Sequence, residues 1–249
     1  MNNNIIPVST YLNMEALTKE PYLPLANKFK SWFGNNWPEV PCREWEYICA
    51  ALYSDLKDNM KVLDMGCGHS VFRIALAKLG AEVTAVDITD VFSRRQQDFL
   101  SNVNIEELFG QCLGVELKEK SFDRVFCMSS IEHFYIGTNG DIEGLKKMKS
   151  WLKDDGILIL TTDFCSFYHD GTSELDGLWN SGYSGRYYDK EHLVNLVNEA
   201  GLKFKGTTDF DTIDWSEIYR REPKRWLDKN NVLQDNCRYT EAILVLEKG

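Results

Sequence analysis

The sequence predicts an α/β protein built on one doubly wound, mostly parallel seven-stranded sheet with helices on both faces. Two observations support this fold class. Between residues 61 and 162, short apolar and β-branched runs alternate with stretches of helical periodicity, which is the pattern of successive βαβ units. The first run ends in a glycine-rich turn, residues 66–68, that leads directly into a helical pattern, as in many nucleotide-binding sheets.

The individual strands and helices follow from the same periodicity. Strands are expected at residues 61–65, 81–87, 103–111, 122–128, 156–162 and 242–246. The third run is the least typical of a buried parallel strand, because it contains Glu106 and Glu107. Helices are expected from residue 43, over residues 72–79, over residues 145–152, and after Asp189, which is placed to cap the last of them.

The chain is expected to be one domain with an added N-terminal part. Residues 1–60 are interpreted as a helical cap and residues 61–249 as the core. Two stretches of the core, near 165–188 and 212–239, do not fit the strand and helix alternation. Long irregular stretches in a compact domain are typical of binding loops, so both are interpreted as insertions that contact a substrate.

Composition narrows the classes of partner. A formal net charge of −10 makes nucleic acid a poor default ligand, and no run is apolar and long enough to span a membrane. Seven cysteines occur without a CxxC pair, which favours reduced core residues and no metal site. Together with the absence of a secretion signal, this predicts a soluble cytoplasmic protein, and the oligomeric state stays open.

The glycine-rich turn is informative because of the residues around it. Asp64 precedes it, Asp87 ends the next strand, and Val71 occupies the position of the third glycine in the dinucleotide fingerprint. A carboxylate at that strand end can accept hydrogen bonds from both hydroxyls of a ribose. The pattern therefore indicates a ligand that contains a ribose, and the missing third glycine disfavours a nicotinamide dinucleotide.

These motifs occur with others in a fixed order. Residues 62–70 and 83–87 are followed by residues 121–123, then 129–134, then 152–156. In this order the chain resembles the class I S-adenosylmethionine-dependent methyltransferase family, and within it the small-molecule, ubiquinone-biosynthesis-like group. The resemblance covers residues 43–205 and implies a Rossmann-like methyltransferase fold.

The resemblance also implies a cofactor, S-adenosylmethionine, with S-adenosylhomocysteine as product. It places Asp64, Gly66, Cys67, Gly68 and His69 at the methionine end, and Asp87 with Ile88 at the ribose and adenine. Ser129 would offer backbone contacts to the methionine amino group. Gln111 and Cys112 stand where the family often has an acid and a small residue that recognise the adenine amine, and a glutamine carbonyl can accept that bond.

Methyl transfer from a sulfonium is an in-line displacement, so positioning and exclusion of water do most of the work. An oxygen nucleophile needs help in losing its proton, and His133, which follows the fourth strand, is the candidate general base. The alternative is that His133 caps a helix or lines the pocket. Asp163, directly after the fifth strand, is a second candidate base or a hydrogen-bond acceptor for the substrate.

A basic segment is the candidate for an anionic substrate. Arg220, Arg221, Lys224 and Arg225 lie among Trp215, Tyr219 and Trp226, and Arg186, Tyr187 and Tyr188 could join them. Such a cluster can hold a phosphorylated group, although a solvated helix face explains it as well. Asp163, Arg186, Tyr187, Tyr188 and Arg221 are therefore the predicted substrate-binding residues.

The function that follows is methylation of a hydroxyl or amine on a small molecule such as a sugar, a phosphorylated precursor or a secondary metabolite. One alternative is a nicotinamide-dependent oxidoreductase or epimerase on a related fold. Another is a non-catalytic subunit that binds the cofactor and supports a partner. A nucleic-acid or protein methyltransferase is disfavoured by the acidity of the chain and by its lack of an Asn-Pro-Pro-Tyr-type motif.

Overall fold

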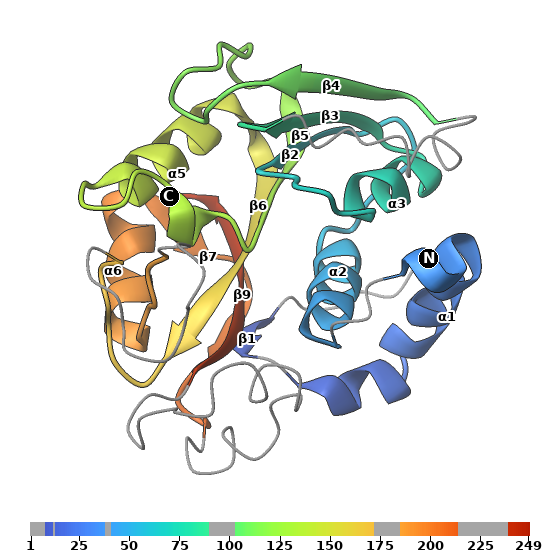
Figure 1. Ribbon diagram of the computed structural model, residues 1–249, viewed down its shortest axis with the longest axis horizontal. Coiled ribbons are helices and arrows are strands. Elements are labelled where there is room, and N and C mark those ends of the chain that lie inside the picture. Colours follow the sequence, from blue (N-terminus) through green and yellow to red (C-terminus); the bar gives the residue numbers. More distant parts are fainter. Residues whose placement is uncertain (1–7, 12, 38–40, 90–102, 172–184, 214–238) are drawn as a thin grey trace.

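The computed structural model of the chain describes residues 8–11, 13–37, 41–89, 103–171, 185–213 and 239–249 (Figure 1). In this part of the chain, nine strands form one sheet. Eight of them follow the order β4-β3-β2-β5-β6-β9-β1-β8, and β7 pairs with β9 beside this path. Helices cover both faces, as the alternation of strand and helix patterns predicted (Figure 1).

The half of the sheet that contains the glycine turn is parallel. It consists of β2 (Lys61–Met65), β3 (Glu82–Asp87), β4 (Ile105–Phe109), β5 (Phe122–Met128) and β6 (Leu152–Cys165). The chain runs outward from β2 through β3 to β4, and then crosses to β5 on the other side of β2. The carboxyl ends of β2 and β5 thus flank the point where the strand order reverses, and ligands of such sheets bind there.

The other half of the sheet is built around β9 (Tyr239–Lys248), which runs antiparallel to β6. Its second edge pairs with β7 (Leu202–Phe204) at one end and with β1 (Val8–Tyr11) at the other, and β8 (Thr207–Asp209) extends the sheet beyond β1. The expectation of seven strands is too low because β9 has ten residues, where residues 242–246 predicted five. An edge of that length accommodates two short strands end to end.

The position of β4, the third predicted strand, at the edge of the sheet accounts for its unusual composition. Among the described strands it lies at the end of the strand order and pairs with β3 alone, and its side chains are half-buried or exposed. Glu106 Oε2 accepts a hydrogen bond from Thr84 Oγ1 at 3.3 Å, and Glu107 Oε1 lies 3.5 Å from Arg73 Nε. An edge strand tolerates these glutamates, whereas a central parallel strand would not.

The helices form one layer on each face. One face is covered by α1 (Tyr22–Phe33), α2 (Pro41–Tyr53) and α3 (Phe72–Lys78) (Figure 1). The other face is covered by α5 (Gly140–Trp151) and α6 (Lys190–Glu199) (Figure 1). Short 3₁₀ turns lie between these elements: η1 (Met14–Thr18), η2 (Gly34–Asn36) and η4 (Ile131–His133). The Asp189 side chain accepts a hydrogen bond from the His192 N–H at 2.9 Å, which confirms the predicted cap. Leu152, predicted within a helix, instead begins β6.

Alternation along the strands divides the core into two hydrophobic layers. Phe126 points to the layer with α1, α2 and α3, where it meets Phe72 edge to face at 5.3 Å, while its neighbours Val125 and Cys127 point to the layer with α5 and α6. The six cysteines of the described part are buried and form no disulfide. None of the described helices has the length and apolar character needed to cross a bilayer.

Truncating Phe126 to alanine should lower the free energy of unfolding by about 3–5 kcal/mol, because the ring is fully buried and its removal leaves a cavity between sheet and helices. Urea denaturation followed by tryptophan fluorescence measures the change. Phe109→Ala is the matched control: its ring is 69% exposed, and its loss should cost less than about 0.5 kcal/mol. Equal losses in the two variants would contradict this assignment of the core.

Candidate functional site

The loop after β2 is shaped by two glycines. Gly66 and Gly68 have φ angles of +70° and +52°, in the left-handed region that favours glycine. A Cβ atom on Gly66 would lie 1.9 Å from Ser130 Oγ, whereas one on Gly68 would have no atom within 4 Å. Gly66 is therefore required for packing, and the backbone at Gly68 faces open space in which a ligand can approach it closely.

Asp87 fastens this loop to the end of β3. Its Oδ2 accepts a hydrogen bond from the Gly68 N–H at 2.9 Å, and its Oδ1 accepts from the N–H and the hydroxyl of Thr89 at 3.0 and 2.9 Å. The N–H groups of Gly66 and Cys67 bond to the carbonyl of Val86 at 2.8 and 3.2 Å. The glycine turn and the carboxylate singled out in the sequence are thus in direct contact.

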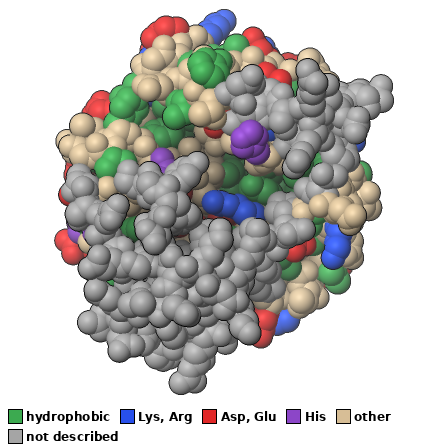
Figure 2. Space-filling view, in the orientation of Figure 1, with side chains coloured by type: hydrophobic (Ala, Val, Ile, Leu, Met, Phe, Trp, Pro, Cys, Tyr) green, Lys and Arg blue, Asp and Glu red, His purple; other side chains and the backbone are tan. Residues whose placement is uncertain are grey.

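A cavity of about 280 Å³ opens beside them at the carboxyl ends of the strands. Twelve residues line it: Met65, Gly66, Asp87, Ile88, Gly110, Gln111, Cys112, Ser130, His133, Phe134, Tyr135 and Ile136. Six of these are among the residues that the sequence analysis assigns to cofactor binding or catalysis: Gly66, Asp87, Ile88, Gln111, Cys112 and His133. Figure 2 shows a hollow in one face of the molecule, bordered by hydrophobic, basic and histidine side chains.

Other residues of the cavity wall were not predicted from the sequence. Ser130, Phe134, Tyr135 and Ile136 belong to the segment that follows β5, where no periodicity indicates which side chains point inward. The Tyr135 hydroxyl donates a hydrogen bond to Gln111 Oε1 at 3.0 Å and so joins this segment to the turn after β4. Five predicted cofactor residues, Asp64, Cys67, Gly68, His69 and Ser129, lie outside the set that lines the cavity.

Asp64, at the end of β2, is a buried carboxyl that lacks partners. Neither of its oxygens has a hydrogen-bond partner among the described residues, and the residue is 1% exposed. Burial raises its pKa to about 7, and the nearby Asp87 adds to the rise while Arg73 opposes it. A buried unpaired carboxyl costs free energy, so this position fits a ligand that brings a hydrogen-bond donor or a positive charge.

Ser129 links the end of β5 to α2. Its φ angle is +42°, which is rare for a residue with a side chain, and its N–H donates to Thr161 at 3.0 Å. Its hydroxyl donates to Glu46 Oε1 at 3.0 Å, and Glu46 Oε2 forms an ion pair with Arg43 at 2.8 Å. Backbone strain of this kind occurs where the surrounding structure fixes a functional geometry.

His133 projects from η4 into the cavity wall, and its side chain is 44% exposed. Its Nε2 lies 3.8 Å from Oε1 of Glu132, which is buried and whose Oε2 accepts a hydrogen bond from Thr162 at 3.1 Å. Burial raises the pKa of Glu132 to about 7. An imidazole that is accessible on one side and backed by a carboxyl can exchange a proton with a bound molecule.

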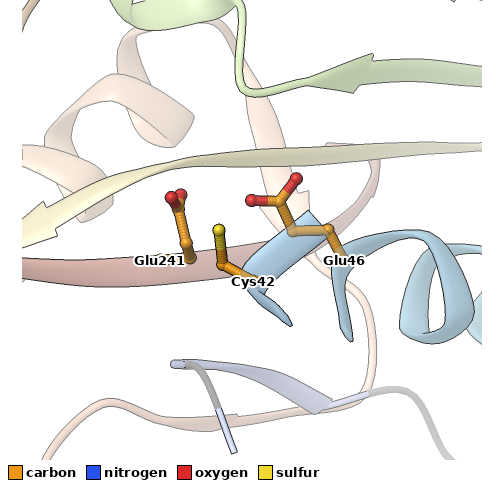
Figure 3. Close-up of side chains that lie close together, drawn as sticks. All are labelled: Cys42, Glu46 and Glu241. Atoms are coloured by element: carbon orange, nitrogen blue, oxygen red, sulfur yellow. The ribbon is translucent and has the colours of Figure 1, made fainter. Parts of the chain in front are cut away.

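Behind His133, four carboxyl groups gather in what we call the acidic cluster: Glu46, Glu132, Asp163 and Glu241. Asp163 and Glu241 are directly paired residues of β6 and β9. Burial raises the pKa of Asp163 to about 8, and the nearby Glu132 adds to the rise. Figure 3 shows Glu241 facing Cys42 and Glu46 of α2. Asp163 was predicted, but its partners were not, because they come from elements far apart in the sequence.

Three residues predicted to bind the substrate are buried and bonded within the fold. The Arg186 side chain is 2% exposed, and its guanidinium donates to the carbonyls of Phe134, Tyr135 and Thr138 at 2.7, 3.1 and 2.7 Å. Tyr187 and Tyr188 are buried, and the Tyr188 hydroxyl donates to Asp141 at 2.8 Å. These groups hold the fold together. Arg221 and the rest of the basic segment lie outside the described residues.

The chain is similar to known methyltransferases. The family "Methyltransferase domain" matches residues 63–160. A ubiquinone biosynthesis O-methyltransferase of Xanthomonas campestris pv. campestris (strain B100) is 28% identical over 170 residues, and one of Xanthomonas axonopodis pv. citri (strain 306) is 30% identical over 176. Each match covers 65% of this chain and 66% of the relative, so the chain spans about two thirds of the length of these relatives.

Solved structures show the same fold. Coclaurine N-methyltransferase, determined with N-methylheliamine and SAH, superposes with a TM-score of 0.60 and 16% identity, over 81% of this chain and 69% of that one. The family match includes the glycine loop and Asp87. Residues 63–160 of the chain therefore match the methyltransferase domain family, and the chain has the fold of S-adenosylmethionine-dependent methyltransferases.

Proposed function

We propose that the chain transfers the methyl group of S-adenosylmethionine to a hydroxyl or an amine of a small molecule. The observation that carries the proposal is the cavity at the switch point of the sheet, with the glycine loop and Asp87 on one wall and His133 on another. Ligands of open α/β sheets bind at this place. The six cysteines of the described residues, which are buried and free, also support a reducing, cytoplasmic location.

The residues around the cavity fit the parts of this cofactor. Asp87 would hold the ribose, with Ile88, Gln111 and Cys112 at the adenine. The loop from Gly66 through Cys67 and Gly68 to His69, with the Ser129 backbone, would hold the methionine end. Asp64, whose oxygens lack partners, would face its amino group. Gly68 supports this arrangement because its free side lets the backbone approach a ligand.

When bound, S-adenosylmethionine supplies a methyl carbon on a sulfonium. The task of the protein is then to orient the acceptor and to exclude water. We assign to His133 the removal of a proton from an acceptor hydroxyl, with the imidazolium stabilised by Glu132 behind it. An acceptor amine would need a general base only if it binds as an ammonium, which must lose a proton before it can accept the methyl group. The displacement itself does not need a metal ion.

The kind of acceptor remains part of the proposal. The curated relatives are named for O-methylation in ubiquinone biosynthesis, which supports a small molecule with a hydroxyl group. An anionic or phosphorylated acceptor depends on Arg221 and its basic neighbours, which the structure does not describe. The nicotinamide alternative receives no support from the loop, since Val71 is buried in the core where a third glycine would be needed.

The experiment that tests the function has two stages. S-adenosylhomocysteine is first titrated into the protein by calorimetry, and candidate acceptors are then incubated with S-adenosylmethionine and screened for a mass gain of one methyl group. Binding followed by methylation supports an enzyme. Binding without methylation of any acceptor would favour the supporting subunit, and binding of NAD in place of S-adenosylhomocysteine would favour the oxidoreductase.

Asp87→Ala should weaken the binding of S-adenosylhomocysteine by at least about tenfold, because it removes a charge-assisted hydrogen bond to the ribose and releases Gly68. Isothermal titration calorimetry measures the change, and an unaltered melting temperature shows that the fold persists. Glu82→Ala is the control, since Glu82 is exposed at the opposite end of the same strand. Unchanged affinity in Asp87→Ala would remove this residue from the cofactor site.

Asp64→Asn should stabilise the ligand-free protein at alkaline pH. The folded-state pKa of Asp64, about 7, lies above its ordinary value of 3.8, so its contribution to stability is present at low pH and is lost as pH rises through 7. The melting temperature of the variant relative to wild type should therefore increase between about pH 5 and about pH 8. Asp55→Asn, at an exposed position, should show no such trend, and a flat difference for Asp64→Asn would contradict its assigned environment.

His133→Gln should slow methylation of a hydroxyl acceptor by about 10²–10⁴-fold, the usual contribution of a general base, while S-adenosylhomocysteine affinity changes by less than about tenfold. Steady-state kcat across pH provides the measurement. The control is His192→Gln, since that imidazole lies on α6 beside Asp189. Wild-type turnover of His133→Gln at every pH would show that His133 only lines the pocket.

A further inference from the structure

The acidic cluster contains more carboxyl groups than the described cations can pair with. Among the ion pairs of the described part of the chain, two reach the cluster: Arg43 with Glu46 at 2.8 Å, and His133 with Glu132 at 3.8 Å. Asp163 and Glu241 take part in neither. Buried carboxylates are normally paired, because an unpaired charge in a low-dielectric environment is costly.

The carboxyl groups that lack a cationic partner, those of Asp163 and Glu241, lie next to each other. The two residues are direct partners in the antiparallel ladder between β6 and β9, so their side chains are neighbours on the same face of the sheet. Like charges directly opposite each other destabilise a sheet. A positive group placed between the two carboxylates would reverse that effect.

Glu241 also has a buried oxygen without a partner among the described residues. The residue is 7% exposed, and its Oε2 has no hydrogen-bond partner among the described residues. A carboxylate oxygen of Glu241, one of Glu46 and the sulfur of Cys42 all lie within 4.8 Å of one another, and Figure 3 shows the three side chains converging. A group that donates hydrogen bonds at this point would satisfy the unpaired oxygen.

The cluster adjoins the proposed reaction site. Ser129 bonds to Glu46 on one side and to Thr161 on the other, while Glu132 stands between His133 of the cavity wall and Thr162. A small molecule bound against these carboxyls would therefore lie next to the cavity that we assign to the cofactor.

We propose that Glu46, Asp163 and Glu241 bind the protonated amino group of the acceptor, so that the substrate is an amine-bearing small molecule. This inference rests on the proposed function and names the class of its substrate. An ammonium group brings one positive charge and three hydrogen-bond donors, which suits three carboxyls supplied by α2, β6 and β9.

An ammonium fits the cluster better than a divalent metal ion. The Arg43 guanidinium, which ion-pairs with Glu46, would repel a second, doubly charged centre nearby. Both oxygens of Glu46 already accept hydrogen bonds, one from Ser129 and one from Arg43. Such oxygens can accept a further hydrogen bond more readily than they can coordinate a metal ion. A single positive charge is also enough to separate Asp163 from Glu241.

Binding should depend on pH. Burial raises the pKa of Asp163 to about 8 and that of Glu241 well above its ordinary value, so an incoming ammonium displaces a proton. Affinity should then rise by up to about tenfold per pH unit between about pH 6 and about pH 8. Among the described residues, the charged and titratable groups that face these two carboxyls are Cys42, Arg43 and Glu46 of α2 and Glu132 and His133 of η4.

The test compares ethanolamine hydrochloride with its uncharged analogue ethylene glycol at matched ionic strength. The full chain is titrated with each probe, and tryptophan fluorescence and melting temperature are recorded. Wild type should bind ethanolamine at least about tenfold more tightly than ethylene glycol, and Glu241→Gln should abolish that preference. Glu247→Gln, the same change on the same strand at a residue paired with Lys203 and Lys205, should retain it.

The proposal would be overturned if wild type showed no preference for ethanolamine, or if the preference persisted in Glu241→Gln. An affinity of wild type for ethanolamine that does not rise with pH would also overturn it. So would stabilisation by MnCl₂ that is lost in Glu241→Gln while ethanolamine has no effect. The pH series needs no variant and decides the matter if Glu241→Gln does not fold. Titration of S-adenosylhomocysteine into the same samples tests the proposed function separately.

Discussion

The hydrogen bond from the Gly68 N–H to Asp87 joins the loop after β2 to the end of β3, and the arrangement of the site depends on it. Both strands are parallel and adjacent, so their carboxyl ends meet at one edge of the sheet. Gly66 must lack a side chain because Ser130, from the end of β5, occupies the space beside it. Three strand ends are thereby held together around one cavity.

Local patterns in the sequence were sufficient for the parallel half of the sheet and for the glycine loop. Strand alternation and the turn residues around Gly66 reflect interactions between near neighbours. The pairing of β1 with β9 could not be predicted, because it depends on contacts such as the bond from the Val245 N–H to Ser9 Oγ, across almost the whole chain. The same is true of Glu241, whose partners lie on α2 and β6.

The N-terminal part of the chain contributes to the site as well as to the fold. It was interpreted as a helical cap; α1 and α2 lie against one face of the sheet, whereas β1 of the same segment is a strand of the sheet. However, α2 also brings Arg43 and Glu46 to the ends of β5 and β6. Arg186 shows the opposite case: this basic residue near the site suggested substrate binding, but its guanidinium bonds to backbone carbonyls and pairs with Asp141.

The guanidinium of Arg186 has a consequence for the energetics of ligand binding. By bonding to carbonyls between Phe134 and Thr138, it fixes the wall of the cavity from behind. Those residues lose their conformational freedom when the protein folds, so a ligand meets a surface that is already ordered. The entropy of ordering this wall is then absent from the free energy of association, which favours tight binding of even a small ligand.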